Sequence, residues 1–302
     1  MPELRWVLGG GRVLELGRRV QVMGILNCTP DSFYDGGRYA DPGAAIDRAL
    51  ALVEEGADIV DVGGESSRPP VYGEAHRVPA EEECRRVVPV IAGVRRQSAV
   101  TLSVDTTKAA VAAPALDAGA DLVNDVSALE DEEMGRAVAG AGAGVILMHR
   151  RGSPATMQLN TEYGDVVAEV CQYLKARVER AVAADIDPAR VALDPGIGFG
   201  KSAAGNRLLI RRLGYLVALG HPVVLGASRK SFIWKPLGLS AGEALEGSLA
   251  AAVLGVVYGA HAVRVHDVAA TVRALRTAEA IVAEGGGAAG SRLALARQVQ
   301  SA

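Results

Sequence analysis

Aromatic residues, cysteine and lysine are all scarce in this chain of 302 residues. Aromatic residues make up 4% of it, with only three phenylalanines, and only five of the 32 basic residues are lysines. The three cysteines, Cys28, Cys84 and Cys171, are odd in number and scattered along the chain. Such an arrangement argues against a disulfide framework and against a thiolate metal site. A phenylalanine or lysine in a polar, glycine-bearing loop is therefore a candidate functional residue.

Long runs of one charge and long apolar runs are also missing. The net charge is −3, so the sequence offers no support for a nucleic-acid partner or a membrane-surface partner. The first residues, MPELRWVLGG, lack the apolar stretch of a signal peptide, and the most apolar tract, SLAAAVLGVVYGAHAV, falls short of a spanning helix. With 49% apolar and 22% charged residues, the sequence predicts a globular cytoplasmic protein.

A short sequence pattern recurs along the chain. It reads GADIVDVGG from Gly56, GADLVNDVS from Gly119 and GAHAVRVHDV from Gly259, with a looser copy, GAGVILMH, from Gly142. Each copy follows an alanine-rich amphipathic stretch, which predicts a helix that ends at the glycine and is followed by a short apolar strand. Together with similar segments elsewhere, the pattern predicts eight strands, at residues 20–26, 58–62, 101–105, 121–125, 144–149, 191–194, 222–227 and 261–266.

Eight strand–helix units predict an α/β protein of the (β/α)8 TIM barrel type, which usually has about 250 residues. A doubly wound open sheet is the competing interpretation. Residues 1–18 predict an N-terminal β-hairpin that turns at its three consecutive glycines and closes the bottom of the barrel, which spans residues 20–284. Residues 285–302 predict a linker and a short C-terminal helix, so the whole chain is one domain.

Polar residues stand at or near the end of every predicted strand. Such residues often begin turns or cap helices, and this reading accounts for Asp61 and Asp125 taken alone. It does not account for all eight strands, because the carboxyl ends of parallel barrel strands share the face that carries barrel active sites. The group comprises Asn27, Asp61, Asp105, Asn124, Asp125, His149, Asp194, Ser228, Arg229, Lys230, Arg264 and His266.

The segment after the sixth predicted strand looks like a nucleotide-binding motif, but we do not interpret it as one. LDPGIGFGKS resembles a phosphate-binding loop, but Pro195 stands where that loop needs its first glycine, and the segment follows the sixth strand instead of opening the fold. We interpret its glycines as allowing the backbone to turn closely against a ligand, with Phe199 projecting into the mouth of the barrel. The histidines show no spacing typical of metal ligands.

The remaining strand-end residues divide by chemistry. Asp105, Asn124, Asp194 and Lys230 combine acceptors, an amide and an ammonium, which suits a planar heterocycle, and a carboxylate such as Asp194 pairs well with two N–H groups of an aminopyrimidine. By contrast, Arg68, Arg264 and His266 are cationic donors that suit a phosphate or diphosphate, and we expect no acceptor to compete for them. Asn27 offers a single neutral oxygen for a Mg²⁺ ion held mainly by phosphates and water.

The ordered motifs MGILNCTPDSFYDGG, DVGGESSRPP, SVDTTKA, NDVS, LMHRRG, LDPGIGFGK, SRKSF and VRVHDV resemble those of the dihydropteroate synthase family over nearly the whole chain. The resemblance implies a (β/α)8 barrel and a transferase that joins 6-hydroxymethyl-7,8-dihydropterin diphosphate to 4-aminobenzoate in folate synthesis. It also implies a homodimer. Two alternatives remain: a non-catalytic pterin-binding paralogue and a pterin-dependent methyltransferase.

The resemblance also implies a role for each site residue. The pterin-binding set is Asp105, Asn124, Met148, Asp194, Phe199 and Lys230, and the diphosphate-binding set is Arg68, Arg264 and His266. The 4-aminobenzoate-binding set is Phe33, Ser67, Pro69, Phe199 and Ser228. Asn27 is implied as the Mg²⁺ ligand, and Asp35, Lys230 and Arg264 are implied as the catalytic residues.

Overall fold

The computed structural model describes residues 4–29, 41–65, 78–152, 156–157 and 159–284. Eight parallel strands form one sheet in the order β8-β7-β6-β5-β4-β3-β10-β9. The ends of this order meet, because the Leu193 amide donates to the Pro222 carbonyl at 2.8 Å and Leu193 forms a parallel bridge with Val223. The sheet therefore closes into the predicted (β/α)8 barrel, and the open-sheet alternative is wrong.

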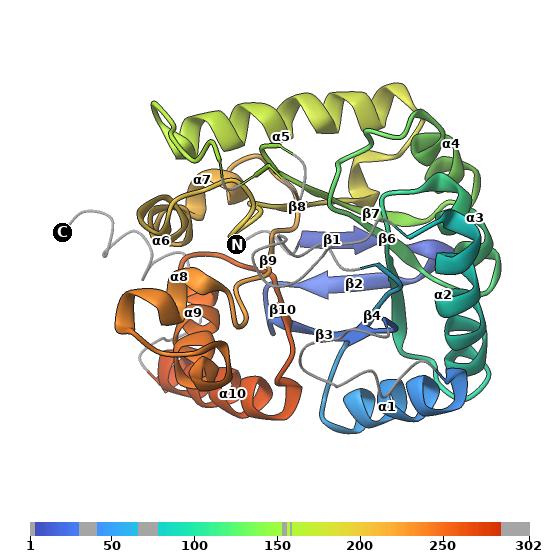
Figure 1. Cartoon of the computed structure of the whole chain (residues 1–302), viewed down its shortest axis with the longest axis horizontal. Coiled ribbons are helices and arrows are strands. Elements are labelled where there is room, and N and C mark those ends of the chain that lie inside the picture. Colours follow the sequence, from blue (N-terminus) through green and yellow to red (C-terminus); the bar gives the residue numbers. More distant parts are fainter. Residues whose placement is uncertain (1–3, 30–40, 66–77, 153–155, 158, 285–302) are drawn as a thin grey trace.

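Figure 1 shows helices around the outside of the strands. The barrel strands are β3 Gln21–Asn27, β4 Ile59–Gly63, β5 Thr101–Asp105, β6 Leu122–Asp125, β7 Gly144–Met148, β8 Val191–Asp194, β9 Val224–Leu225 and β10 Ala262–Val265. The helices are α1 Pro42–Glu54, α2 Ala80–Arg95, α3 Ala109–Asp117, α4 Glu132–Gly140, α5 Val166–Ala183, α6 Ala203–Arg211, α7 Gly214–Val217, α8 Ser231–Trp234, α9 Leu245–Val257 and α10 Val268–Glu284. The sequence therefore predicted each strand to within a few residues.

The recurring glycine–alanine pattern has a common structural cause. Gly56, Gly119, Gly142 and Gly259 each follow a helix and have φ between +56° and +116°, a conformation that side chains with a Cβ rarely adopt. The alanine after each glycine donates back to a carbonyl five residues earlier, for example Ala57 N to Leu52 O at 2.9 Å. This pairing is the Schellman motif, and it directs the chain from the helix into the next strand.

Alternation along the strands decides which side chains enter the barrel. Ile59 at the start of β4 packs in a buried apolar cluster inside the barrel, and Asp61 and Gly63 share its face because strand side chains alternate with a period of two. The same period places Leu122 and Asn124 of β6 on one face. The interior is therefore apolar at the amino ends of the strands and polar toward their carboxyl ends.

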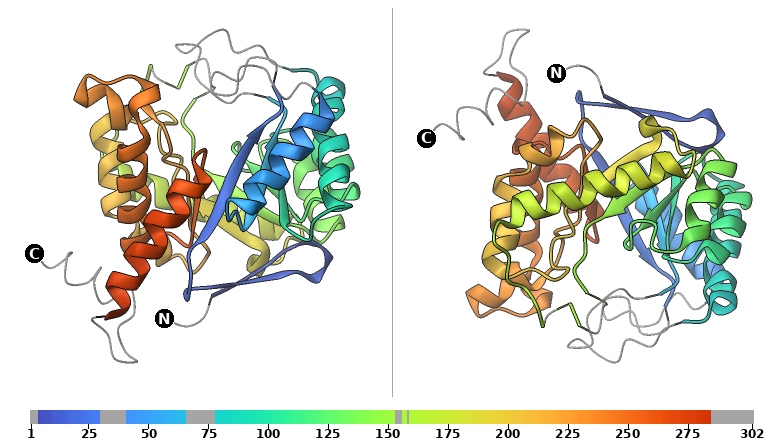
Figure 2. Two further views of the ribbon diagram at one scale, coloured as in Figure 1. Left: turned by 90° about the horizontal axis from the view of Figure 1, so that it is seen from below. Right: turned by 90° about the horizontal axis from the view of Figure 1, so that it is seen from above.

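A hairpin closes the apolar end of the barrel, as the sequence predicts. Strands β1 Leu4–Val7 and β2 Val13–Leu16 pair antiparallel and lie across that end, at the bottom of the left view in Figure 2. Trp6, Leu8 and Leu16 are buried against Met23, Ile59, Leu122, Ile146, Ala192, Val224 and Ala262. The hairpin thus completes the inner core that the strands alone would leave open to water.

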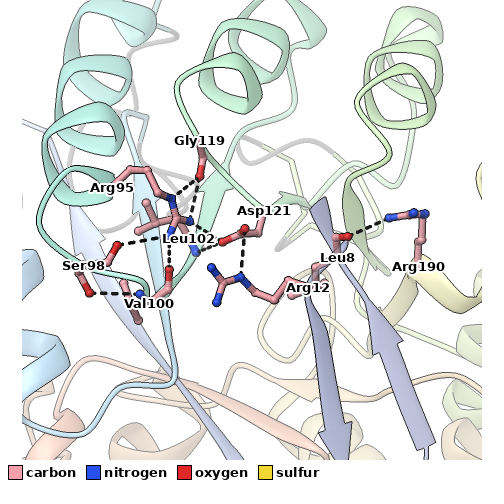
Figure 3. A network of polar contacts seen from close by, with 9 residues as sticks. All are labelled: Leu8, Arg12, Arg95, Ser98, Val100, Leu102, Gly119, Asp121 and Arg190. Carbon is pink, nitrogen blue, oxygen red and sulfur yellow. Dashed lines mark hydrogen bonds and ion pairs between the residues drawn. The ribbon is translucent and has the colours of Figure 1, made fainter. Parts of the chain in front are cut away.

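Polar contacts fix the hairpin to the barrel (Figure 3). The Asp121 carboxylate accepts from Arg95 Nη2 at 2.6 Å and from Arg12 Nε, within the hairpin connection, at 3.3 Å. On the other side of the hairpin, Arg190 Nη1 donates to the Leu8 carbonyl at 2.9 Å, and the Arg190 carbonyl accepts from Trp6 Nε1 at 3.0 Å. Side chains of the hairpin and a carbonyl of its connection therefore have partners on the barrel.

We expect Trp6→Ala to lower the free energy of unfolding by about 3–5 kcal/mol, because it empties a fully buried site and removes a hydrogen bond. Urea denaturation measures this change. The matched control is Leu159→Ala, whose side chain is 83% exposed and whose loss should cost less than about 0.5 kcal/mol. Equal costs for the two variants would contradict the role of the hairpin as a plug.

The prediction for residues 285–302 lies outside the described residues. Within the part of the chain that the structure describes, no helix combines the length and apolar character needed to cross a membrane.

Candidate active site

The carboxyl ends of the barrel strands lie opposite the hairpin (Figure 2). Side chains from several strands converge there. A Cβ atom added at Gly226, just after β9, would lie 3.6 Å from Asp194 Oδ2, 3.7 Å from Lys230 Nζ and 3.9 Å from Arg264 Cβ. Asp194 ends β8, and Arg264 lies in β10. The absence of a side chain at Gly226 therefore leaves a space that a carboxylate and an ammonium both border.

Arg264 is the electrostatic centre of this site. Its Nε donates to Asp61 Oδ2 at 2.5 Å, and its Nη2 donates to Asp105 Oδ2 at 2.6 Å. Burial lowers the pKa of Arg264, but Asp61 and Asp105 more than offset this effect and raise it above the ordinary value. The expectation that no acceptor competes for Arg264 is wrong, because two inward-facing carboxylates of β4 and β5 lie beside it.

Asp61 is a site residue for which the sequence predicts no binding role, because a turn or a helix cap could account for it. It is fully buried, and its Oδ2 accepts from both Arg264 Nε and Asn124 Nδ2, the latter at 3.1 Å. Its Oδ1 has no hydrogen-bond partner among the described residues. A sequence signal for this role exists: Asp61 stands in the middle of a strand covered on both faces, where an unpaired charge is costly.

Burial moves the pKa values of the two carboxyl groups and the lysine of this site toward pH 7, because it disfavours their charged forms. It raises the pKa of Asp105 to about 7, against the lowering effect of Arg264, and it also raises the pKa of Asp194. It lowers the pKa of Lys230 to about 8, although Asp194 opposes the shift. Perturbed groups that border a common space are typical of functional sites.

The glycine-rich loop after β8 approaches protein backbone, not only the space for a ligand. A Cβ at Gly196 would lie 1.8 Å from the His149 carbonyl oxygen, and one at Gly200 would lie 2.5 Å from the Arg151 carbonyl oxygen. Both glycines have positive φ, +66° and +69°. The loop is therefore packed against the segment that follows β7, and our interpretation of these two glycines as facing a ligand is wrong.

Phe199 lies in the same loop and reaches Lys230. The Lys230 ammonium is 4.6 Å from the centre of the Phe199 ring and donates to the Ile197 carbonyl at 2.5 Å. An ammonium at this distance from an aromatic ring makes a favourable cation–π contact. The structure thus brings together two of the predicted site residues that stand 31 positions apart in the sequence.

A second group lies where β9 and β10 end. Ser228 Oγ is 3.1 Å from His266 Nδ1 and accepts from the His266 amide at 3.3 Å. Between Ser228 and Lys230, Arg229 has φ of +57° and donates to both carboxylate oxygens of Asp267, at 2.8 and 2.6 Å. This bidentate ion pair fixes the turn that carries Ser228 and Lys230.

Asn27 and Met148 also lie at strand ends. Asn27 is the last residue of β3 and is half-buried, and Met148, the last residue of β7, is buried and pairs with Asp194 across the sheet. Within the described ranges, no group of three or more His, Cys, Asp or Glu side chains is arranged to hold a metal ion. A single amide oxygen at a strand end fits a Mg²⁺ ion that takes most of its ligands from a phosphate and water.

Five predicted site residues, Phe33, Asp35, Ser67, Arg68 and Pro69, lie outside the described residues. Their predicted roles stay predictions. The described candidates nevertheless come from six different barrel strands and from the turns after β8, β9 and β10, so the fold itself assembles the site.

We expect kcat/KM for a substrate that binds at this site to depend on pH along a bell-shaped curve, with an acidic limb near pH 7 and an alkaline limb near pH 8. Below about 7, Asp105 gains a proton and loses its charge as an acceptor, and above about 8, Lys230 loses the proton that makes it a cation. Lys230→Arg should remove the alkaline limb, because arginine stays protonated throughout this range. A rate that stays constant between pH 6 and 9 would contradict these assignments.

Known proteins resemble this chain in sequence and in fold. The family model of pterin binding enzymes matches residues 23–266. The dihydropteroate synthase of Synechocystis is 44% identical over 274 residues, which cover 90% of this chain and 93% of that protein. The structure of Yersinia pestis dihydropteroate synthase with a sulfonamide drug superposes with a TM-score of 0.87 at 40% identity, covering 92% of this chain and 99% of that one. The Xanthomonas albilineans dihydropteroate synthase with 4-aminobenzoic acid has a TM-score of 0.84 at 46% identity, covering 92% and 98%.

Proposed function

Because the chain belongs to the family of pterin-binding enzymes, and within it to the dihydropteroate synthases, we propose that it condenses 6-hydroxymethyl-7,8-dihydropterin diphosphate with 4-aminobenzoate. The products are 7,8-dihydropteroate and diphosphate. The observation that carries this proposal is the convergence of Asp194, Lys230 and Arg264 on the space beside Gly226.

The pterin is assigned to the buried end of the site. Asp194 accepts from two N–H groups of the aminopyrimidine edge, and Lys230 donates to an acceptor on the ring. Asp105 and Asn124 supply an acceptor and an amide to the rest of the ring. The apolar faces of the ring rest on Met148 and Phe199.

The diphosphate and the amine bind closer to the mouth. Arg264, His266 and Arg68 bind the diphosphate. Asn27 would hold a Mg²⁺ ion, which would neutralise part of the charge of the diphosphate. Phe33, Ser67, Pro69, Phe199 and Ser228 surround the 4-aminobenzoate. Ser228 is bound to His266, so the amine pocket borders the diphosphate pocket.

The reaction is a substitution at the CH2 group of the pterin. The C–O bond to diphosphate breaks and its electron pair leaves with the diphosphate, while the amine nitrogen forms the new C–N bond and then releases a proton to solvent or diphosphate. Positive charge that develops on the pterin is stabilised by the nearby carboxylates Asp61, Asp105 and Asp194. Asp35 is assigned to the same charge. Positioning and electrostatics suffice, so no strong general base is required.

Turnover of the two substrates tests the proposed function. The expected result is equimolar release of diphosphate and 7,8-dihydropteroate, detected by a coupled assay and by mass spectrometry, only when 4-aminobenzoate and Mg²⁺ are both present. Tight pterin binding without release would support a non-catalytic paralogue instead. Methyl transfer from a pterin cosubstrate would support a methyltransferase.

We also propose a homodimer. Large apolar side chains are exposed on helices that pack against one another, including Leu208 of α6 at 42%, Leu254 of α9 at 48% and Leu237 beside α8 at 68%. Sedimentation equilibrium should give twice the chain mass, and Leu254→Asp should shift it toward the monomer.

We propose a cytoplasmic location because all three cysteines are free thiols.

A further inference from the structure

Lys201 is a buried lysine that the proposed reaction does not use. Its side chain is 3% exposed, and its ammonium donates to three main-chain carbonyls: Gly196 at 2.8 Å, Phe199 at 3.0 Å and His149 at 3.3 Å. An ammonium has three N–H donors, so every one of them has a partner. Lysine is rarely buried so completely, because desolvation of the charge is costly.

The three carbonyls belong to two neighbouring segments of the barrel. His149 directly follows β7, and Gly196 and Phe199 lie in the loop after β8. This loop, residues 195–200, contains three glycines with positive φ between +66° and +84°, so its sequence alone leaves many backbone conformations open. Lys201 ties the loop to the adjacent segment and selects one of them.

Asn206 of α6 also holds this loop. Its Oδ1 accepts from the Gly198 amide at 2.7 Å, and its Nδ2 donates to the Lys201 carbonyl at 3.2 Å and to the Ser202 carbonyl at 2.9 Å. Two buried polar side chains therefore define the shape of a loop that borders the site.

The loop contributes contacts that the site needs. The Gly196 amide donates to Asp194 Oδ1 at 2.6 Å, and the Ile197 carbonyl accepts from Lys230. Asp194 and Lys230 are also held by other means, since Asp194 ends a strand and Lys230 follows the turn fixed by Arg229 and Asp267. Phe199, by contrast, belongs to the loop itself, so the position of its ring against Lys230 depends on the path of the loop backbone.

We propose that Lys201 is a positioning residue, whose ammonium holds the loop of residues 195–200 so that Phe199 forms a wall of the 4-aminobenzoate pocket. This inference rests on the proposed function for the identity of the substrate. It assigns to Lys201 no contact with either substrate. Phe199 also forms one apolar face of the pterin pocket, but the pterin keeps its polar partners Asp194 and Lys230, which are held independently of the loop. Loss of the ammonium should therefore affect the amine more than the pterin.

Lys201→Met tests this inference, because methionine keeps much of the side-chain volume and removes all three donors. We expect KM for 4-aminobenzoate to rise about tenfold, while KM for the dihydropterin diphosphate changes by less than about threefold. Lys201→Arg, which keeps a cationic donor, should recover part of the loss. The matched control is Lys175→Met, at an exposed lysine of α5, which should change neither KM.

The split between the two KM values separates positioning from a purely structural role. A structural role would lower the melting temperature and the fraction of active enzyme and leave both KM values unchanged, and that result would overturn the inference. An equal rise in both KM values would also overturn it. If Lys201→Met does not fold, Lys201→Gln, which keeps two N–H donors, is expected to show the same split with a smaller rise.

Failure of the proposed function is distinguishable from failure of this inference. Wild-type turnover reports on the function, and the ratio between variant and wild type reports on Lys201. If the wild type binds 4-aminobenzoate without turnover, the dissociation constants of the two ligands replace the KM values, with the same tenfold and threefold expectations. A wild type that binds no 4-aminobenzoate overturns both proposals.

Discussion

Asp194→Asn is expected to lower kcat/KM for the dihydropterin diphosphate by about 100-fold or more, equivalent to roughly 3 kcal/mol of transition-state stabilisation. The amide places a donor where the pterin also presents donors, so one hydrogen bond is replaced by a repulsive contact. The substitution also removes the negative charge that faces Lys230. Steady-state kinetics at pH 7.5 with saturating 4-aminobenzoate measure the effect.

Asp47→Asn is the matched control for this variant. Asp47 lies on α1 and is exposed, so the same chemical change there should alter kcat/KM by less than about twofold. Circular dichroism and thermal melting establish that both variants are folded. A catalytic efficiency near the wild-type value for Asp194→Asn would remove Asp194 from the pterin site.

Arg264→Ala is expected to have a comparable effect on catalysis, about 3 kcal/mol or more, and a large effect on stability as well. Without its guanidinium, the carboxylates of Asp61, which is fully buried, and Asp105, which is 12% exposed, have no cation bound between them. Breaking a buried ion pair from one side typically costs about 3–5 kcal/mol. Urea denaturation measures this loss, with Arg211→Ala, at an exposed arginine of α6, as the control.

The stability loss in Arg264→Ala should depend on pH. Burial already raises the pKa of Asp105 to about 7, and loss of the cation raises it further above the unfolded value near 4. The destabilisation is therefore largest above pH 7 and shrinks as pH falls and the carboxyl gains a proton. Adding Asp61→Asn should restore part of the stability at pH 8 without restoring activity. A pH-independent loss would contradict this account.

Much of the fold follows from local chemistry that the sequence displays. The four glycine–alanine copies mark helix ends because only glycine enters the left-handed conformation cheaply, and the apolar segment after each copy becomes a barrel strand. The polar strand-end residues then meet because parallel strands share one direction. In this way the sequence places Asp105, Asn124, Asp194 and Arg264 in a common site.

Partners across the barrel are harder to predict, because they depend on register and tilt. Asp61 and Asp125 look alike in sequence, since each is an aspartate near a strand end. Asp125 accepts from the Ser127 and Leu129 amides at 2.8 and 2.7 Å, as a turn residue does, whereas Asp61 faces inward and binds Arg264 from the opposite end of the chain. Only the closed sheet brings that pair together.

The glycine-rich loop shows a second limit of the sequence. Its glycines indicate a close approach of the backbone, but not to what, and two of them contact the segment after β7. Lys201 follows the last glycine and resembles a phosphate-binding lysine in sequence. In the structure it is buried beneath the loop, where three carbonyl oxygens accept from its ammonium.

A crystal structure of the enzyme with bound 7,8-dihydropteroate tests the central claim most directly. We expect the aminopyrimidine edge within hydrogen-bond distance of Asp194, an acceptor of the ring near Lys230, the rest of the ring near Asp105 and Asn124, and the aminobenzoate ring beside Phe199. A product bound elsewhere on the barrel, or bound here without a hydrogen bond to Asp194 or Lys230, would contradict this assignment of the site.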